Sequence, residues 1–369
     1  MYGFQSLYFY FFLFYFCYAY IICLKITVKR NNYITATILF LPLFFLAAMR
    51  GETVGGDLRN YIPAFTEICK EQNIVRILES GYEPGYSLLN KLIGSISPTP
   101  RFLLISTSFL SLIGPCYLIY KYSNNIWLSL IMYCMMGFYT TTFNIIRQSI
   151  AVSFFFLSFP HLLNRNAKKF FLYSALSISM HYSAIALLLV FPLTKRELSL
   201  KRTVLYTIIV IGLYILFSSS LLGTIITLFF VKYNPESIME AHSGTGWNLL
   251  ILYITIFFLF FLIFLRRRKY LLPEERKMVN TLIVFLLLST YFQLFATSYA
   301  FVSRMGLYYY VPIIITIPKI LSIVRAPILK LSVISMMVFL CIFHFYKAYS
   351  YDEDAGTNAH DIIPYVFIK

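Results

Sequence analysis

Four arginines in this chain are candidates for binding an anionic ligand: Arg50, Arg59, Arg147 and Arg304. Arg50, Arg147 and Arg304 stand near the ends of long apolar runs, where a charged side chain is costly to keep and commonly marks a site or a pathway. Arg59 lies in the segment that begins with Arg50. An arginine side chain presents a planar fork of N–H donors that matches a phosphate group. Several arginines from distant parts of the chain therefore suit a phosphate-bearing headgroup, above all a pyrophosphate.

The first two arginines belong to the segment RGETVGGDLRNY, residues 50–61. Its glycines permit tight backbone turns, so that backbone amides and side chains can approach a ligand closely. Asp57 and Tyr61 lie in the same stretch, and the aspartate could orient an arginine or accept a proton. A plainer interpretation is that Arg50 reaches from a helix end to the water interface, while Asp57 caps a helix that begins near Leu58.

A second polar group lies in the segment TTTFNIIRQSIA, residues 140–151. Asn144, Arg147 and Gln148 are spaced i, i+3 and i+4, so a helix presents them on one face. The competing interpretation is an arginine that simply reaches water from the end of a helix. His181, in SISMHYSA, lies at the centre of an apolar stretch, where a polar side chain needs a polar cavity around it.

Other classes of site have no support in the sequence. It contains no cluster of Cys, His or acidic residues with metal-ligand spacing, and neither a P-loop nor a GxGxxG motif. We therefore predict no metal, no nucleotide and no other cofactor. The net charge of +16 would suggest nucleic acid in a soluble protein, but no nucleic-acid-binding motif is present, so no nucleic-acid partner is predicted.

The elements that must position these side chains are membrane helices. Apolar residues make up 59% of the 369 residues and charged residues only 12%, with a mean hydropathy of +0.74. A soluble domain carries roughly twice that share of charge. An all-α polytopic integral membrane protein is predicted. Because about 20 apolar residues cross a bilayer as a helix, we predict about ten transmembrane helices: 4–24, 33–49, 102–120, 126–143, 145–163, 203–222, 248–265, 278–301, 306–324 and 329–347.

The distribution of Lys and Arg sets the predicted orientation, because basic loops stay in the cytoplasm. A single crossing at 170–192, which has His181 at its centre, would place later basic clusters outside. A re-entrant helical hairpin there leaves 20 basic and 3 acidic residues in cytoplasmic loops, and 11 basic and 12 acidic residues outside. The chain is then one transmembrane domain, 1–369, with a main external loop with short helices at 50–101 and an external C-terminal tail at 348–369.

The polar segments, taken in order, resemble a known family. The pattern begins with R-x3-VG-x-D-x3-Y at residues 50–61. It continues with YEPGYSLLNKL (82–92), RQSIA (147–151), HYSAIALLL (181–189), SRMGLYYY (303–310) and PYVFIK (364–369). Each segment is short, but their order and spacing over nearly the whole chain resemble the EpsG group of Wzy-like polysaccharide polymerases.

This resemblance implies a membrane glycosyltransferase at the outer face of the bacterial cytoplasmic membrane. Its substrates would be oligosaccharide repeat units carried on undecaprenyl pyrophosphate, in contact with membrane lipid. A repeat-unit flippase and a chain-length regulator would be its partners. Two other functions would also use cations in a membrane cavity: a flippase for lipid-linked oligosaccharides, and an O-antigen ligase that transfers chains onto a lipid A core.

The resemblance also suggests a role for each candidate residue. Arg147 and Arg304 would hold the pyrophosphate and stabilise the charge that develops on the leaving group. Arg50 and Arg59 would orient the loop or bind a second phosphate. The candidate general bases are Asp57, Glu83 and His181. Of these the histidine is favoured, because a histidine side chain ordinarily titrates near neutral pH. The remaining candidates for contact with the substrate are Tyr61, Asn144 and Gln148.

Overall fold

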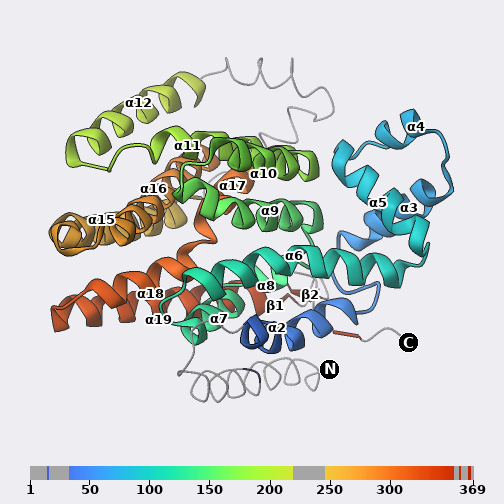
Figure 1. The fold of residues 1–369 in the computed structure, drawn as a ribbon, viewed down its shortest axis with the longest axis horizontal. Coiled ribbons are helices and arrows are strands. Elements are labelled where there is room, and N and C mark those ends of the chain that lie inside the picture. Colours follow the sequence, from blue (N-terminus) through green and yellow to red (C-terminus); the bar gives the residue numbers. More distant parts are fainter. Residues whose placement is uncertain (1–14, 16–32, 219–245, 353–356, 359–364, 367–369) are drawn as a thin grey trace. The chain divides into compact units, whose positions relative to one another are not determined.

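The computed structural model describes residues 15, 33–218, 246–352, 357–358 and 365–366. It divides into two compact units, Met1–Ile185 with Ile317–Lys369, and Ala186–Thr316. Helices dominate the described residues of both units (Figure 1). The all-helical class predicted from composition is therefore correct, and within the described residues the exception is one antiparallel pair of two-residue strands.

The first unit contains most of the candidate site residues. Its elements are α2 (Tyr33–Ala48), α3 (Leu58–Lys70), α4 (Ile74–Leu78), α5 (Pro84–Ile96), α6 (Pro100–Tyr122), α7 (Ile126–Met135), α8 (Phe138–Thr141), α9 (Ile146–Leu163), α10 (Ala167–Met180), α19 (Pro327–Tyr349), β1 (Tyr351–Asp352) and β2 (Thr357–Asn358). Helix α9 packs against both α6 and α10, and Figure 1 shows these three helices side by side.

Small residues allow these three helices to approach closely. A Cβ atom at Gly114 of α6 would lie 2.4 Å from the Cα of Ser153 in α9, so only glycine fits there. The Gly114 amide donates a hydrogen bond to Ser153 Oγ (2.8 Å), and Ser177 of α10 donates one to the Ala151 carbonyl (2.6 Å). Small residues and polar contacts of this kind hold helices together in a membrane, where hydrophobic burial between helices is weak.

The second unit is built around α16. Its elements are α11 (Val190–Leu193), α12 (Leu200–Ser218), α15 (Gly246–Arg267), η2 (Arg268–Tyr270), α16 (Pro273–Ala296), η3 (Ala300–Val302) and α17 (Ser303–Tyr310). Two further helices belong to it in part: η1 (Tyr182–Leu189) crosses its first boundary and α18 (Ile313–Ile323) crosses its last. Helices α15 and α17 pack against α16. The rings of Phe292 and Tyr309 stack, and the buried Tyr309 hydroxyl donates a hydrogen bond to the Ala186 carbonyl.

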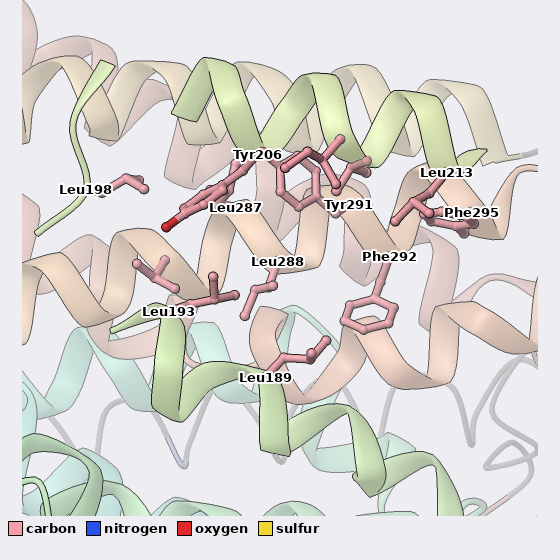
Figure 2. A pocket seen from close by; sticks show the side chains of 13 residues that line it. Leu189, Leu193, Leu198, Tyr206, Leu213, Leu287, Leu288, Tyr291, Phe292 and Phe295 are labelled. Carbon is pink, nitrogen blue, oxygen red and sulfur yellow. The ribbon is translucent and has the colours of Figure 1, made fainter. Parts of the chain in front are cut away.

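A cavity of about 290 Å³ lies within the second unit (Figure 2). Its thirteen lining residues are leucine, isoleucine, valine, phenylalanine and tyrosine, contributed by η1, α11, the segment before α12, α12 itself and α16. The hydroxyl of Tyr291, one of these residues, is hydrogen-bonded to the hydroxyl of Thr207 in α12 (2.9 Å). Because this lining is almost entirely apolar, a site for proton transfer has to be sought elsewhere.

Five described helices are long and apolar enough to cross a membrane: Pro100–Tyr122, Ile146–Leu163, Gly246–Tyr270, Pro273–Ala296 and Pro327–Ala348. They match five of the ten spans predicted from the sequence. A sixth candidate, predicted at 306–324, consists of two helical pieces, Ala300–Tyr310 and Ile313–Ile323, that meet at a bend of 45°. Five to six spans are thus supported within the described part of the chain.

The other predicted spans have different outcomes. The span predicted at 126–143 is interrupted, because α7 ends at Met135 and Gly137 takes a left-handed backbone conformation with φ of 75°. The ten residues of α7 fall short of the roughly 20 needed to cross a bilayer. Helix α2 has 16 residues, and α12 is described as far as Ser218. Apart from Tyr15, the span predicted at 4–24 lies outside the described residues.

Segment 50–101 forms the three short helices α3, α4 and α5 rather than a membrane span. Helix α5 packs on α3 through a small apolar core that includes Phe65, Ile93 and Leu103. Lys91 of α5 donates hydrogen bonds to the carbonyls of Cys69 (3.0 Å) and Glu71 (2.6 Å), at the C-terminal end of α3. These cationic contacts satisfy carbonyl groups that the helix itself leaves unpaired.

Candidate active site

Glu83 is the centre of a buried polar cluster in the first unit. Its side chain is only 4% exposed, and each carboxylate oxygen contacts a different partner. One oxygen, Oε2, accepts a short hydrogen bond from Nη1 of Arg147. The other, Oε1, lies 2.7 Å from Nδ1 of His181 and accepts a second, longer bond from the Tyr182 amide (3.3 Å). Two of the three candidate general bases and one of the candidate pyrophosphate ligands are therefore in contact.

The three members of this cluster come from three helix ends. Glu83 directly precedes α5, Arg147 is the second residue of α9, and His181 follows the last residue of α10. Helix α5 approaches α10 closely because Gly85 has no side chain: a Cβ there would lie 2.7 Å from the Cβ of Ser179. This approach brings Glu83 within reach of a histidine that is 98 positions away in the sequence.

Arg147 also contacts a group of three tyrosines. Its Nε donates a hydrogen bond to the Tyr61 hydroxyl (3.2 Å), and its guanidinium carbon lies 4.8 Å from the ring centre of Tyr82. The rings of Tyr61, Tyr82 and Tyr86 have centres 5.7–6.0 Å apart in every pairing. The Arg147 side chain remains 23% exposed. The guanidinium is therefore held in a fixed orientation by ionic, hydrogen-bond and cation–π contacts.

The charge state of Glu83 follows from its surroundings. Burial alone would raise the pKa of this carboxyl, but the hydrogen bond from His181 and the charge of Arg147 outweigh burial and lower the pKa to about 2. Glu83 is therefore ionised at neutral pH and can only accept hydrogen bonds. As a consequence Nδ1 of His181 donates the hydrogen bond to Glu83, and Nε2 is the ring nitrogen that Glu83 does not contact.

The tyrosines beside Arg147 behave as neutral groups. Burial raises the pKa of Tyr61, and the nearby positive charge of Arg147 opposes this effect without cancelling it. Burial likewise raises the pKa of Tyr82 and of the fully buried Tyr86. Their hydroxyls remain protonated at neutral pH, so these side chains contribute shape and hydrogen bonds to the site rather than charge.

Arg50 lies at the end of α2, where a helix leaves its last carbonyl groups without partners. Its side chain is only 1% exposed, and its Nη1 donates hydrogen bonds to the Ala47 carbonyl (2.8 Å) and to Ser108 Oγ (3.4 Å). Its guanidinium carbon lies 4.7 Å from the ring centre of Phe143. Arg50 thus joins the end of α2 to α6, and both roles expected for it, orienting the loop and binding a phosphate, stay predictions.

The remaining candidates of the first unit lie around the cluster. Asp57 directly precedes α3, which begins at Leu58 as predicted, but its side chain makes no capping hydrogen bond to the described residues of that helix. Arg59 is exposed on α3, and Gln148 is buried in α9. Asn144 lies beside Gly55, whose φ of +105° and close approach to the Phe143 carbonyl require a glycine.

Arg304 belongs to the second unit, where it is the second residue of α17 and exposed. Whether it acts together with Arg147 stays a prediction. Among the described residues, no group of three or more His, Cys, Asp or Glu side chains is arranged to hold a metal ion.

Tyr82 and Tyr86 were not among the candidates from the sequence. Both lie in the segment YEPGY, residues 82–86, in which Pro84 begins α5. A tyrosine in a chain that holds 31 of them gives no signal by its type alone. The available signal was the placement of two tyrosines around the one carboxylate of that segment, at the start of a short helix outside the predicted spans.

Comparison with known proteins identifies a family. The model of the EpsG family matches residues 33–367 of the chain, which includes the Glu83–Arg147–His181 cluster and all other candidate residues. No curated protein and no solved structure matches.

Proposed function

Because the chain belongs to the EpsG family of Wzy-like polysaccharide polymerases, we propose that it polymerises oligosaccharide repeat units carried on undecaprenyl pyrophosphate. It would do so as a multi-pass protein of the bacterial cytoplasmic membrane, with its active site facing outside. The observation that best supports this reaction is Glu83, which joins His181 and Arg147 in one buried cluster. A base next to a guanidinium suits an attack on a sugar whose leaving group is a pyrophosphate.

In the proposed reaction, a hydroxyl oxygen of one repeat unit attacks the anomeric carbon of the growing chain. The new glycosidic C–O bond forms as the bond between that carbon and the phosphate oxygen breaks. Undecaprenyl pyrophosphate leaves with the electron pair of the broken bond, and the hydroxyl proton passes to Nε2 of His181. The lipid-linked donor is already activated, so the reaction requires neither a nucleotide nor a metal ion.

Glu83 acts in this proposal as a positioning residue for His181. Its ionised carboxylate accepts the Nδ1 proton, which fixes the ring orientation and the tautomer with a basic Nε2. It also stabilises the positive charge that the imidazole acquires when it takes the proton. A carboxyl with a pKa of about 2 is itself a weak base, so we assign the role of proton acceptor to His181 rather than to Glu83. Asp57 remains the alternative base.

Arg147 is proposed to bind the pyrophosphate. Two of its nitrogens, Nη1 and Nε, are used by Glu83 and Tyr61, and within the described residues Nη2 makes no hydrogen bond. Its two N–H groups can therefore reach a ligand from a guanidinium that is already oriented. Arg304 is proposed to bind the same pyrophosphate. Arg59, Tyr61, Asn144 and Gln148 are proposed to line the substrate path around it.

The membrane arrangement proposed for this function has ten spans, of which 126–143 is broken at Gly137, and a re-entrant hairpin at 170–192. Two observations support it. Helix α10 ends at Met180, and the backbone of His181 is extended. In the second unit, Glu197 forms ion pairs with Arg268 (3.7 Å) and Arg276, so two of the basic clusters share one face.

This arrangement predicts the accessibility of two exposed positions, Glu52 and Lys195. A membrane-impermeant maleimide should label a Glu52→Cys variant in intact cells, because 50–101 lies outside. The same reagent should label Lys195→Cys only after the membrane has been permeabilised. Labelling of Lys195→Cys in intact cells would show that 170–192 crosses the membrane once and would rule out the hairpin.

The proposed function is tested with purified protein in lipid vesicles. Supplied only with repeat units on undecaprenyl pyrophosphate, in the presence of a metal chelator, the protein should produce chains of many repeat units and release undecaprenyl pyrophosphate. Chain length is read by gel electrophoresis and mass spectrometry. Activity that disappears in chelator and returns with a divalent ion would contradict the metal-free mechanism.

The products also separate the proposed function from its two alternatives. A flippase would move the lipid-linked units across the bilayer without lengthening them, and a ligase would transfer chains only when a lipid A core is added. Either outcome would overturn the proposal of a polymerase. A repeat-unit flippase and a chain-length regulator remain the proposed partners in the cell, because one would deliver the units and the other would limit the length of the product.

A further inference from the structure

The C-terminal end of the chain contacts the loop that leads to the candidate active site. Tyr365 is 9% exposed, and its hydroxyl donates a hydrogen bond of 2.5 Å to the carbonyl of Leu46 in the last turn of α2. The next residue, Val366, accepts a hydrogen bond of 2.7 Å from the amide of Gly51. Tyr365 thus binds the backbone on the N-terminal side of Arg50, and Val366 binds it on the C-terminal side.

These contacts complete the hydrogen bonding of the α2 terminus. The last four carbonyls of a helix have no partners within it. Here the Phe45 carbonyl accepts from the Met49 amide (2.9 Å), and the carbonyls of Ala47 and Ala48 accept from the guanidinium groups of two arginines, Arg50 and Arg101. Tyr365 supplies the donor for the fourth carbonyl, that of Leu46. The helix end is therefore closed by a residue from the far end of the sequence.

From Gly51 a short series of contacts leads to Arg147. The Gly51 carbonyl accepts a hydrogen bond from the buried Val54 (3.1 Å), and the Gly55 carbonyl accepts one from Leu58 at the start of α3 (3.0 Å). One turn later, Tyr61 accepts the hydrogen bond from Arg147 Nε. Any displacement of residues 50–57 would therefore move the side chain that orients this guanidinium.

We infer that Tyr365 and Val366 form a clamp that positions the 50–57 loop, and through it Tyr61 and Arg147, for the reaction. Its effect on chain synthesis rests on the proposed polymerase function, whereas its effect on the loop does not. Tyr365 and Val366 are positioning residues, since they act on the site through the loop. A misplacement of about 1 Å at a reacting group can lower a rate by roughly 10²-fold.

The loop itself provides the first test. Val54 is fully buried, so a Val54→Cys reporter should react slowly with a maleimide while the clamp is in place. Adding Tyr365→Ala should raise its labelling rate by about tenfold or more, because the loop then opens more often. The matched control is Tyr346→Ala, since Tyr346 of α19 is 74% exposed and its loss should leave the rate unchanged. Equal labelling with and without Tyr365 would overturn the clamp.

Rescue by a disulfide distinguishes positioning from a general loss of stability. An ideal Cβ at Gly51 would lie 3.5 Å from the Cβ of Val366, which is within the range of disulfide bonds. Tyr365→Ala should lower chain synthesis by roughly 10- to 100-fold. Adding the pair Gly51→Cys and Val366→Cys should restore most of the activity when the disulfide is formed and lose it again when it is reduced.

The outcomes separate the two proposals. If the wild-type protein makes no chains, the polymerase proposal fails, and the labelling of Val54→Cys still decides whether the clamp holds the loop. If the wild-type protein is active and Tyr365→Ala is equally active at equal membrane levels, the clamp is wrong and the polymerase stands. A disulfide that forms fully without restoring Tyr365→Ala would likewise show that holding the loop is not what Tyr365 contributes.

Discussion

A His181→Gln variant is expected to polymerise repeat units about 10²–10⁴-fold more slowly than the wild-type protein, because it lacks the imidazole that we propose takes the proton from the attacking hydroxyl. Glutamine can still donate a hydrogen bond to Glu83, so the buried carboxylate keeps a partner and the protein should insert at normal levels. The measurement is the initial rate of chain formation by purified protein in vesicles.

Two further variants complete the experiment: a control at another histidine and a change at Glu83. His161→Gln is the matched control, since His161 stacks on Tyr173 at the end of α9 and lies outside the Glu83 cluster. It should retain normal activity. Glu83→Gln should also slow the reaction strongly, because a neutral amide no longer fixes the His181 tautomer or offsets its positive charge. Near-normal rates for His181→Gln would exclude His181 as the general base and leave Asp57 as the candidate.

The sequence predicted the membrane helices better than it predicted the site. The five long helices match predicted spans because hydropathy and length are local properties of the chain. The interrupted segment 126–143 was missed, since a glycine within an apolar run gives no sign of a left-handed backbone until the packing is known. Gly137 is such a position.

The polar cluster could be predicted in part. His181, Glu83 and Arg147 were each expected to matter, but the role of each depends on contacts between positions 64 and 98 residues apart. Those contacts exist because Gly85 lets α5 approach Ser179 of α10, which no local pattern reveals. The sequence therefore supplied the candidate residues, and tertiary packing determined that Glu83 is the group between the other two.

For Arg50, in contrast, the sequence did not distinguish between two possible roles. An arginine at the end of an apolar run has the same local sequence whether it binds an anion or closes the helix. The structure places its Nη1 against the Ala47 carbonyl and its guanidinium beside Phe143. The charge of Arg50 is tolerated in this buried position because it lies at the carbonyl end of a helix, whose dipole favours a cation. The side chain of Arg147, in contrast, remains partly exposed.

Because the Arg147 side chain is partly exposed, its replacement gives the second prediction of a large effect on chain synthesis. Arg147→Lys should lower chain synthesis by roughly 10²-fold or more, which is the usual cost of removing an oriented donor from a developing negative charge. Lysine retains a positive charge beside Glu83, so the buried carboxylate is not left unpaired. It lacks the planar fork that contacts Tyr61 and Glu83 and that we propose also binds a phosphate. The loss should therefore appear in activity and not in the amount of inserted protein.

Arg304→Lys should have a comparable effect if both arginines bind one pyrophosphate, as we propose. Residues that act on the same group have non-additive effects, so the double variant should be little slower than either single variant. Arg76→Lys is the matched control, because Arg76 is exposed on α4 and forms only a loose ion pair with Glu71 (3.7 Å). Effects that multiply in the double variant would mean that the two arginines act separately. Normal chain lengths in both single variants would mean that neither guanidinium binds the leaving group, because an ammonium group in the same place would then serve equally well.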